Sequence, residues 1–289
     1  MENNVDFSSI DWNAMWAKAA HKVNRSDEKE QRELWDKRAE SFAKPVAHSK
    51  NEGEKGYKDY ITNMLERIEV RPDWTVLDIG SGPGTLAIPL AEKVRSVTAL
   101  DISSRMLERL QKKAFERKLS NISYINVSFQ EAMAKNSLNT HDVIVASRSL
   151  MSMDMKPVLE YLNSIARQAV YLTLPVVHLP FDWEAYRAIG REDKNHASYI
   201  YVYNMLFQIG ITANVEILYS KIRMQFSSVE KAIEDIQWRT DPFTPEETRK
   251  LRLFLEEKFK ASGNPDGFTH EGFSQWALIW WKKYEGALT

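Results

Sequence analysis

The stretch that decides the fold runs from Val76 to Ser103 and reads VLDIGSGPGTLAIPLAEKVRSVTALDIS. It begins with a short apolar run that suits a buried parallel strand, and glycine and proline interrupt this run at residues 80–84. A helix is expected from Leu86 to Lys93, directly after the turn. A second apolar run then ends at Asp101. The stretch therefore predicts a strand, a glycine turn, a helix and a second parallel strand that ends in a carboxylate.

The glycine turn and the carboxylate together predict a nucleoside-binding site. Glycine allows a ligand to lie directly against the backbone, and it tolerates φ > 0. Asp101 stands about 20 residues past the first glycine, at the tip of the next strand. A carboxylate at that place can accept hydrogen bonds from both hydroxyls of a ribose.

Two features separate this site from a dinucleotide site. The dinucleotide fingerprint is G-x-G-x-x-G, whose last glycine allows close helix packing beside a pyrophosphate. Here the third glycine comes one place early, at Gly84, and Thr85 occupies the dinucleotide position. Asp78 adds a negative charge that would repel a pyrophosphate and attract the ammonium group of a methionine moiety. The residues thus favour a nucleoside that carries an amino acid.

The segments D-I-G-S-G-P-G at 78–84 and A-L-D-I-S-S-R-M-L at 99–107 resemble the class I (Rossmann-like) S-adenosylmethionine-dependent methyltransferases of the small-molecule type. The resemblance covers residues 57–173 well and the rest of the chain only by position. It implies methyltransferase activity with S-adenosylmethionine as the cofactor. It also implies an α/β fold with a seven-stranded, mostly parallel sheet in the order 3-2-1-4-5-7-6, helices on both faces and an antiparallel edge.

The resemblance implies a set of cofactor-binding residues at the carboxyl ends of the first four strands and in the segments before them. These are Asp78, Gly80, Ser81, Gly82, Gly84, Thr85, Asp101, Ile102, Met106, Ser128, Phe129, Ser147, Tyr57 and Trp35. Ser128 and Phe129 fit the adenine position loosely, because the family's common acidic residue is absent there. Tyr57 or Tyr60 would lie near the methionine carboxylate, although an interfacial tyrosine that packs its ring is an equal alternative. Trp35 is either a cofactor contact or a packing residue.

The chain is expected to divide into an N-terminal helical cap at 1–56 and a methyltransferase domain at 57–289. Two helix candidates, 7–23 and 26–44, precede the first strand. A helical insert is predicted at 228–272, between the last two strands, because Ser227 with Glu230 and Thr244 with Glu247 have the spacing of capping boxes. We expect the cap and the insert to form a mobile cover over the pocket and to determine acceptor specificity.

Aromatic residues crowd the stretch that follows the fifth predicted strand. They are Phe181, Trp183, Tyr186, Tyr199, Tyr201, Tyr203 and Phe207. This stretch is expected to form the wall of the acceptor pocket. His178 stands at its start and is the best-placed candidate for a general base, although a histidine in such a turn also serves purely structural roles. His141 precedes a strand on the opposite edge and is a poor candidate.

Arg148 follows the fourth predicted strand, at the edge where open α/β sheets bind ligands. It either holds a carboxylate or phosphate of the acceptor or forms an internal salt bridge. The other residues at this edge give the sequence S-R-S-L at 147–150. Enzymes that methylate amino groups of nucleic acids carry an acidic residue or asparagine followed by Pro-Pro and an aromatic residue there. Nucleic acid is therefore an unfavoured partner.

The amino-acid composition narrows the classes of function and partner that are possible. Lys and Arg number 39 against 40 Asp and Glu, so the net charge of −1 provides no field that attracts nucleic acid. The absence of cysteine excludes disulfides, thiolate metal sites and cysteine-based methylation of pyrimidine C5, and no metal site is expected. No signal peptide or apolar span is evident, so a cytoplasmic location and no membrane partner are expected. An RNA or protein methyltransferase and a non-catalytic cofactor-binding protein stay as alternatives, and the oligomeric state is left open.

Overall fold

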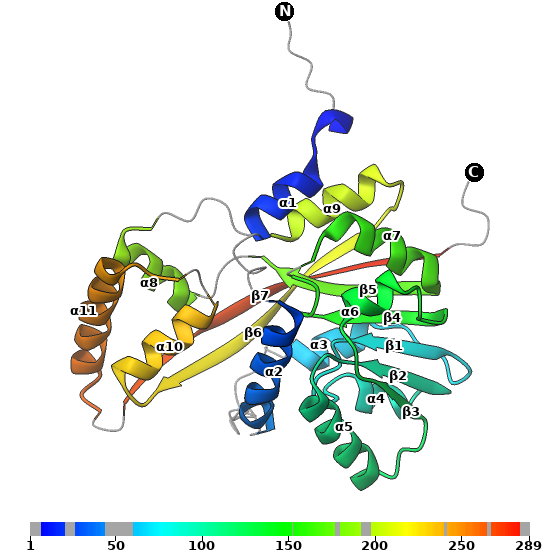
Figure 1. Cartoon of the computed structure of the whole chain (residues 1–289), viewed down its shortest axis with the longest axis horizontal. Coiled ribbons are helices and arrows are strands. Elements are labelled where there is room, and N and C mark those ends of the chain that lie inside the picture. The colour runs from blue at the N-terminus through cyan, green and yellow to red at the C-terminus, as the bar shows by residue number, and fades with distance from the viewer. Residues whose placement is uncertain are drawn as a thin grey trace, which may run out of the picture.

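The computed structural model describes residues 7–20, 27–43, 60–151, 153–176, 180–191, 198–239, 242–264 and 267–283. One sheet of seven strands runs through the molecule in the order β3-β2-β1-β4-β5-β7-β6, as predicted (Figure 1). The strands are β1 (Thr75–Ile79), β2 (Ser96–Leu100), β3 (Ile122–Ile125), β4 (His141–Ser147), β5 (Ala166–Pro175), β6 (Asn214–Phe226) and β7 (Phe268–Lys282). The strands from β3 to β5 pair in parallel, and β7 pairs antiparallel with both β5 and β6.

The helices cover both faces of the sheet (Figure 1). They are α1 (Trp12–Ala20), α2 (Glu28–Ala43), α3 (Tyr60–Arg67), α4 (Ala87–Ala91), α5 (Ser104–Glu116), α6 (Phe129–Ala134), α7 (Met155–Ile165), α8 (Pro180–Ile189), α9 (Tyr199–Gln208), α10 (Val229–Arg239) and α11 (Pro245–Ser262), with a 3-10 turn η1 (Phe7–Ser9) at the start. None of the helices within these described ranges combines the length and the apolar character needed to cross a membrane.

Alternation along the strands divides the core between the two faces. Leu77 and Ile79 of β1 point into one core, which packs against α7 and α9. Val76 points into the other, which packs against α3, α4 and α5. Asp78 shares the second face because side chains two residues apart in a strand lie on the same side. The alternation along β1 therefore places the Asp78 carboxylate on this second face, one residue before the end of a central strand.

A third apolar core lies beyond the edge of the parallel sheet, where β6 and β7 continue as a long hairpin (Figure 1). It is formed by α8, α10, α11 and the hairpin, with Phe181, Phe226 and Leu251 among its buried residues. Two of these helices belong to the predicted insert, and α8 comes from the connection before β6. β7 begins at Phe268, where its pairing with β6 starts opposite Phe226.

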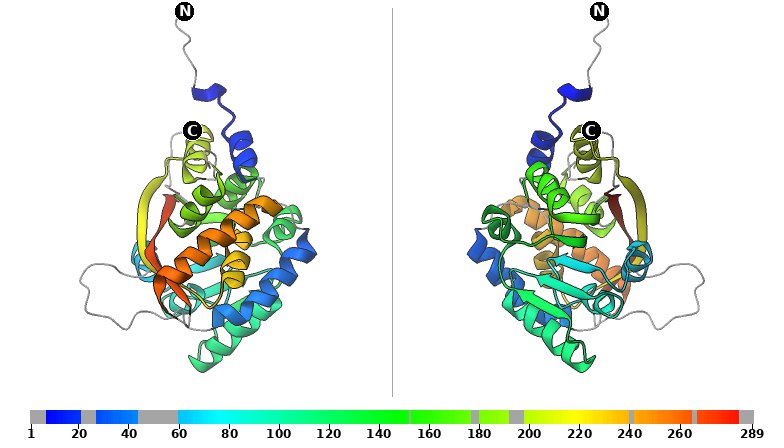
Figure 2. Two further views of the ribbon diagram at one scale, coloured as in Figure 1. Left: turned by 90° about the vertical axis from the view of Figure 1, so that its left-hand side faces the viewer. Right: turned by 90° about the vertical axis from the view of Figure 1, so that its right-hand side faces the viewer.

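The two N-terminal helices lie at different places on the molecule. α1 packs against α9 and α7, and Trp16 of α1 is fully buried in the main core. The indole Nε1–H of Trp16 donates to the carbonyl oxygen of Met153 at 2.9 Å. In contrast, α2 lies beside α5, at the end of the sheet that holds β2 and β3 (Figure 2).

Candidate active site

The glycine turn after β1 is fixed by the sheet itself. The backbone N–H groups of Gly80 and Ser81 both donate to the carbonyl of Leu100, at 2.8 and 3.0 Å. Gly80, Gly82 and Gly84 have φ of 68°, 54° and 83°, a region that residues with a Cβ rarely adopt. A Cβ on Gly80 would also collide with the Cβ of Ser149. Gly80 therefore allows close packing against Ser149, just after β4, whereas the backbone of Gly82 has no atom within 4 Å of its Cβ position and is left open to a ligand.

Asp78 is a buried carboxylate at this turn, only 2% exposed. Burial and, to a lesser extent, the charge of Asp101 raise the pKa of Asp78 to about 7, although a hydrogen bond from the backbone of Ala87 partly opposes the shift. Its Oδ2 and the hydroxyl of the neighbouring Ser81 are buried without a hydrogen-bond partner among the described residues. Buried polar atoms are almost always paired, so these two fit a site built for a polar ligand group.

Asp101, at the end of β2, faces the same turn. Its Oδ2 accepts from the N–H of Gly82 and its Oδ1 from the N–H of Ser103, both at 2.8 Å. A carboxylate offers about four acceptor positions, so both oxygens can still receive hydroxyl hydrogen bonds. Burial raises the pKa of Asp101, and these backbone hydrogen bonds counteract that effect.

Helix α2 covers this end of the sheet through two polar residues that the sequence reasoning missed. Arg32 donates to the carbonyl of Ile102 at 2.7 Å. Asp36 accepts from the hydroxyl of Ser103 at 2.5 Å. Arg32 and Asp36 are four residues apart and therefore lie on one face of the helix. This spacing was the signal in the sequence that pointed to a shared polar contact. Trp35 is half-buried on the same helix.

The other predicted cofactor residues differ in their surroundings. Ser128 is buried at the N-cap of α6, where its hydroxyl accepts from the N–H of Glu131 at 3.0 Å. Phe129 and Met106 are buried, Ile102 is half-buried and Thr85 is exposed. Tyr57 and His178 lie outside the described residues.

Next to the glycine turn, three hydroxyl groups meet at the ends of β4 and β5. The phenol of Tyr60, at the start of α3, lies 2.8 Å from Ser147 Oγ and 2.6 Å from Thr173 Oγ1. Burial raises the pKa of Tyr60, so the phenol stays neutral and can donate. Thr173 Oγ1 also accepts the backbone N–H of Arg148 at 3.0 Å. The backbone of Arg148, the residue predicted to bind an anion, is therefore hydrogen-bonded to this cluster of three hydroxyl groups.

The predicted aromatic wall is not one surface. Phe181 is fully buried in the third core, against Phe226 and Phe268. Tyr201 lies near Trp12 of α1, and Phe207 is 67% exposed beside Phe7. The prediction of a single wall is therefore wrong, because α8 packs Phe181 into the third core, whereas α9 places Tyr201 and Phe207 against α1 and the N-terminal turn.

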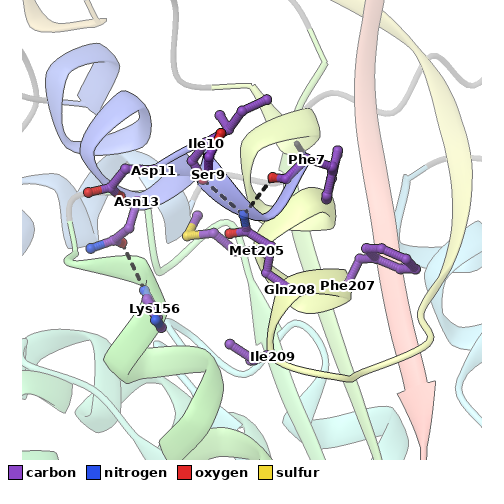
Figure 3. Close-up of a pocket in the computed structure, with 10 residues that line it drawn as sticks. All are labelled: Phe7, Ser9, Ile10, Asp11, Asn13, Lys156, Met205, Phe207, Gln208 and Ile209. Carbon is purple, nitrogen blue, oxygen red and sulfur yellow. Dashed lines mark hydrogen bonds between the residues drawn. The ribbon is translucent and has the colours of Figure 1, made fainter. Parts of the chain in front are cut away.

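A hollow of about 540 Å³ lies between the N-terminal turn and α9 (Figure 3). The ten residues that line it include Phe207 of the predicted aromatic wall but none of the predicted cofactor-binding or catalytic residues. Polar contacts join its two sides, since Gln208 Nε2 donates to the carbonyl of Ile10 at 2.9 Å and the backbone N–H of Lys156 donates to Asn13 at 3.0 Å. We interpret the hollow as a packing groove rather than as the active site.

The opposite edge of the sheet holds structural polar groups. His141 is buried, with its Nε2 2.8 Å from Thr98 Oγ1, and burial lowers its pKa. Arg167 pairs with Asp142 at 2.8 Å. Across the described ranges, no group of three or more histidine, aspartate and glutamate side chains could hold a metal ion.

Comparison with known proteins gives matches of two kinds. Residues 76–169 match the family model described as "Methyltransferase domain". An uncharacterised protein of Haemophilus influenzae is 32% identical over 250 residues, which is 86% of this chain and 88% of that protein. Shorter matches are to ribosomal RNA methyltransferases, such as the 23S rRNA (uracil(1939)-C(5))-methyltransferase RlmD of Enterobacter, 23% identical over 45% of this chain and 30% of that enzyme.

Solved structures share the fold. The YcgJ protein of Bacillus subtilis superposes with a TM-score of 0.53 at 18% identity, over 78% of this chain and 98% of that one. At this identity the likeness concerns the fold alone. The stretch that the family model matches contains the glycine turn and both carboxylates, Asp78 and Asp101.

Proposed function

Because the chain belongs to the class I S-adenosylmethionine-dependent methyltransferases, we propose that it transfers a methyl group from this cofactor to a small-molecule acceptor. The end of β4 carries this proposal. It offers Ser147, Arg148 and Ser149 in place of the acidic or asparagine residue and paired prolines typical of enzymes that methylate nucleic acid amines. The absence of cysteine argues against the uracil C5 chemistry in the name of the Enterobacter relative.

S-adenosylmethionine supplies an activated methyl group that leaves its sulfonium in an in-line displacement. We propose that Asp101 accepts hydrogen bonds from the ribose hydroxyls and that Asp78 receives the ammonium group. The turn from Gly80 to Gly84, with Ser81, Thr85 and Ile102, would support the cofactor through backbone and hydroxyl contacts. Ser128, Phe129 and Met106 would border the adenine, Ser147 and Tyr57 would border the methionine end, and Trp35 would cover the cofactor from α2. Alignment and exclusion of water are then the main contributions of the protein.

On the acceptor side, we propose His178 as a general base and Arg148 as a charge that fixes an anionic group beside the methyl. A base is required only if the attacking atom must lose a proton. The cap at 1–56 and the insert at 228–272 are proposed to close over the acceptor. In the described part of the cap, α2 covers the cofactor edge and α1 belongs to the main core.

The pKa of Asp78 leads to a prediction on cofactor affinity. Because burial raises this pKa to about 7, the charged form that attracts the ammonium is a minority at pH 6 and a majority at pH 8. The charged fraction changes about tenfold over this interval, so affinity for S-adenosylhomocysteine should rise about tenfold. Asp78→Asn should bind more weakly at pH 8 and lose the dependence. Calorimetric titration of both proteins at the two pH values measures the effect.

The same shift has a stability consequence in the ligand-free protein. A carboxyl whose folded pKa lies above its ordinary 3.8 is favoured in its neutral form by folding, so its contribution falls as pH rises from about 4 to about 7. Urea unfolding should show this decline in wild type and its absence in Asp78→Asn. A stability that fell equally in both proteins would assign the decline to other groups.

Asp101→Asn should weaken the binding of S-adenosylhomocysteine roughly tenfold to a hundredfold, because hydrogen bonds to a charged group contribute about 1.5–3 kcal/mol. Asparagine is preferred to alanine because its amide oxygen can still accept from one of the two N–H groups, of Gly82 and Ser103, that Asp101 holds. Asp73→Asn, an exposed carboxylate before β1, is the matched control. Calorimetry gives the affinities and urea unfolding confirms folding. An unchanged dissociation constant in folded Asp101→Asn would remove Asp101 from the ribose site.

Turnover on fractionated acceptors tests the proposed function itself. The protein is incubated with methyl-labelled S-adenosylmethionine and, in parallel, with a low-molecular-weight metabolite extract, unmodified ribosomal RNA and denatured protein. Label in the metabolite fraction supports the proposal, and label in RNA or protein contradicts it. Tight cofactor binding with no transfer to any fraction would favour a non-catalytic binding protein.

A further inference from the structure

Arg148 combines an unusual backbone conformation with an exposed side chain. Its φ of 57° lies in the left-handed region, which is unfavourable for a non-glycine residue and is concentrated at functional sites. Its side chain is exposed, with the guanidinium carbon 4.6 Å from the ring centre of Tyr60 and 5.6 Å from that of Trp276. Within the described residues Arg148 forms no ion pair, so the internal salt bridge considered from the sequence is not found there.

The two rings beneath the guanidinium are themselves held in place. The phenol of Tyr60 is bound by Ser147 and Thr173, and its ring meets that of Trp276 edge-on, with centroids 6.2 Å apart. The backbone of Arg148 is anchored to Thr173 as well. An arginine stacked on aromatic faces keeps its planar edge free for a bidentate contact with a carboxylate or phosphate. The cluster therefore orders a cation whose hydrogen-bonding edge is available.

Sheet register places this cation on the acceptor side of the pocket. The proposed cofactor contacts Asp101 and Asp78 lie at the ends of β2 and β1. Ser147 pairs with Thr173, and Trp276 pairs with Pro175 at the end of β5, so the Arg148 guanidinium leans from β4 towards β7. β7 lies three strands from β1, about 14 Å at the usual strand spacing. The guanidinium charge of Arg148 therefore lies towards β7, away from β1 and β2, whose ends carry the proposed cofactor contacts.

We infer that the methyl acceptor carries a carboxylate or phosphate group and that Arg148, supported by Tyr60 and Trp276, binds it. The inference rests on the proposed function and names the substrate class of that site. Tyr60 is a positioning residue in this scheme, because it acts through the guanidinium.

The experiment uses the full chain saturated with S-adenosylhomocysteine and three small probes: benzoate, phenyl phosphate and the neutral analogue benzamide. Arg148→Gln is compared with wild type and with Arg71→Gln, whose guanidinium carbon also lies over an indole ring, 5.0 Å from the centre of Trp74 before β1. Saturation-transfer NMR titration measures probe affinity. We expect wild type to prefer at least one anionic probe to benzamide, and Arg148→Gln to lose roughly tenfold or more of that affinity. Arg71→Gln should behave as wild type.

The carboxylate that Arg148 binds belongs either to the acceptor or to the methionine part of the cofactor. Calorimetry with S-adenosylhomocysteine alone distinguishes these two cases. We expect Arg148→Gln to bind it within about twofold of wild type. A loss of roughly tenfold, with unchanged binding of 5′-methylthioadenosine, would assign Arg148 to the cofactor's own carboxylate and overturn the inference. Equal affinity of wild type for anionic and neutral probes would also overturn it. A wild-type protein that binds no S-adenosylhomocysteine would instead refute the proposed function.

Discussion

Replacing Gly80 by alanine is expected to destabilise the protein by about 2–5 kcal/mol and to abolish measurable cofactor binding. A side chain at φ 68° costs about 1–2 kcal/mol, and a forced contact in a packed region costs about 1–3 kcal/mol. The added Cβ would collide with the Cβ of Ser149, whose hydroxyl donates to the carbonyl of Ile79 at 2.7 Å. Relief of the clash would therefore move the end of β4 away from β1. Urea unfolding and calorimetry with S-adenosylhomocysteine measure the two effects.

Gly82→Ala is the matched control for this prediction. Gly82 also has a left-handed backbone, at φ 54°, but no atom lies within 4 Å of the position that its Cβ would take. It should lose only the conformational part, about 1–2 kcal/mol. Equal losses in the two variants would show that backbone conformation alone explains the effect and that the contact with Ser149 is easily relieved.

The parts of the fold that the sequence predicted correctly are those that depend on local chemistry. Apolar runs interrupted by the glycine turn predicted β1 and β2, and the family resemblance then gave the strand order. Serine is a strong local signal for the start of a helix, and Ser103 caps α5, where its hydroxyl accepts from the N–H of Met106 at 3.1 Å. The predicted capping box of Thr244 with Glu247 begins α11. In each case the deciding atoms lie within a few residues of one another.

The parts that the sequence did not predict depend on partners far apart in the chain. The third core joins α8 to the helices of the β6–β7 hairpin, and no local pattern in α8 indicates this partner. The Tyr60 phenol lies against Thr173, which is 113 residues away, and the left-handed backbone of Arg148 follows from anchoring at the same hydroxyl. Single-sequence patterns carry periodicity and turn chemistry, whereas such contacts depend on the assembled sheet.

Trp16→Ala is expected to destabilise the protein by about 3–5 kcal/mol, the usual loss when a buried tryptophan is truncated. Trp16 is fully buried among the residues of the main core, although α1 precedes the sheet and was predicted as part of a cover. Trp16→Phe should lose less, because it keeps most of the packing and removes the hydrogen bond to Met153, which contributes about 0.5–1.5 kcal/mol. Urea unfolding of each variant gives the free energies.

Met15→Ala controls for any effect of shortening α1 side chains, since Met15 is the neighbouring residue and is 43% exposed. Its free energy of unfolding should stay within about 0.5 kcal/mol of wild type. A loss below about 1 kcal/mol in Trp16→Ala would mean that α1 docks loosely and can belong to a moving cover. The expected larger loss would make α1 a permanent part of the core. A closing motion of the described cap would then be confined to α2, which packs beside α5 and makes polar contacts to Ile102 and Ser103.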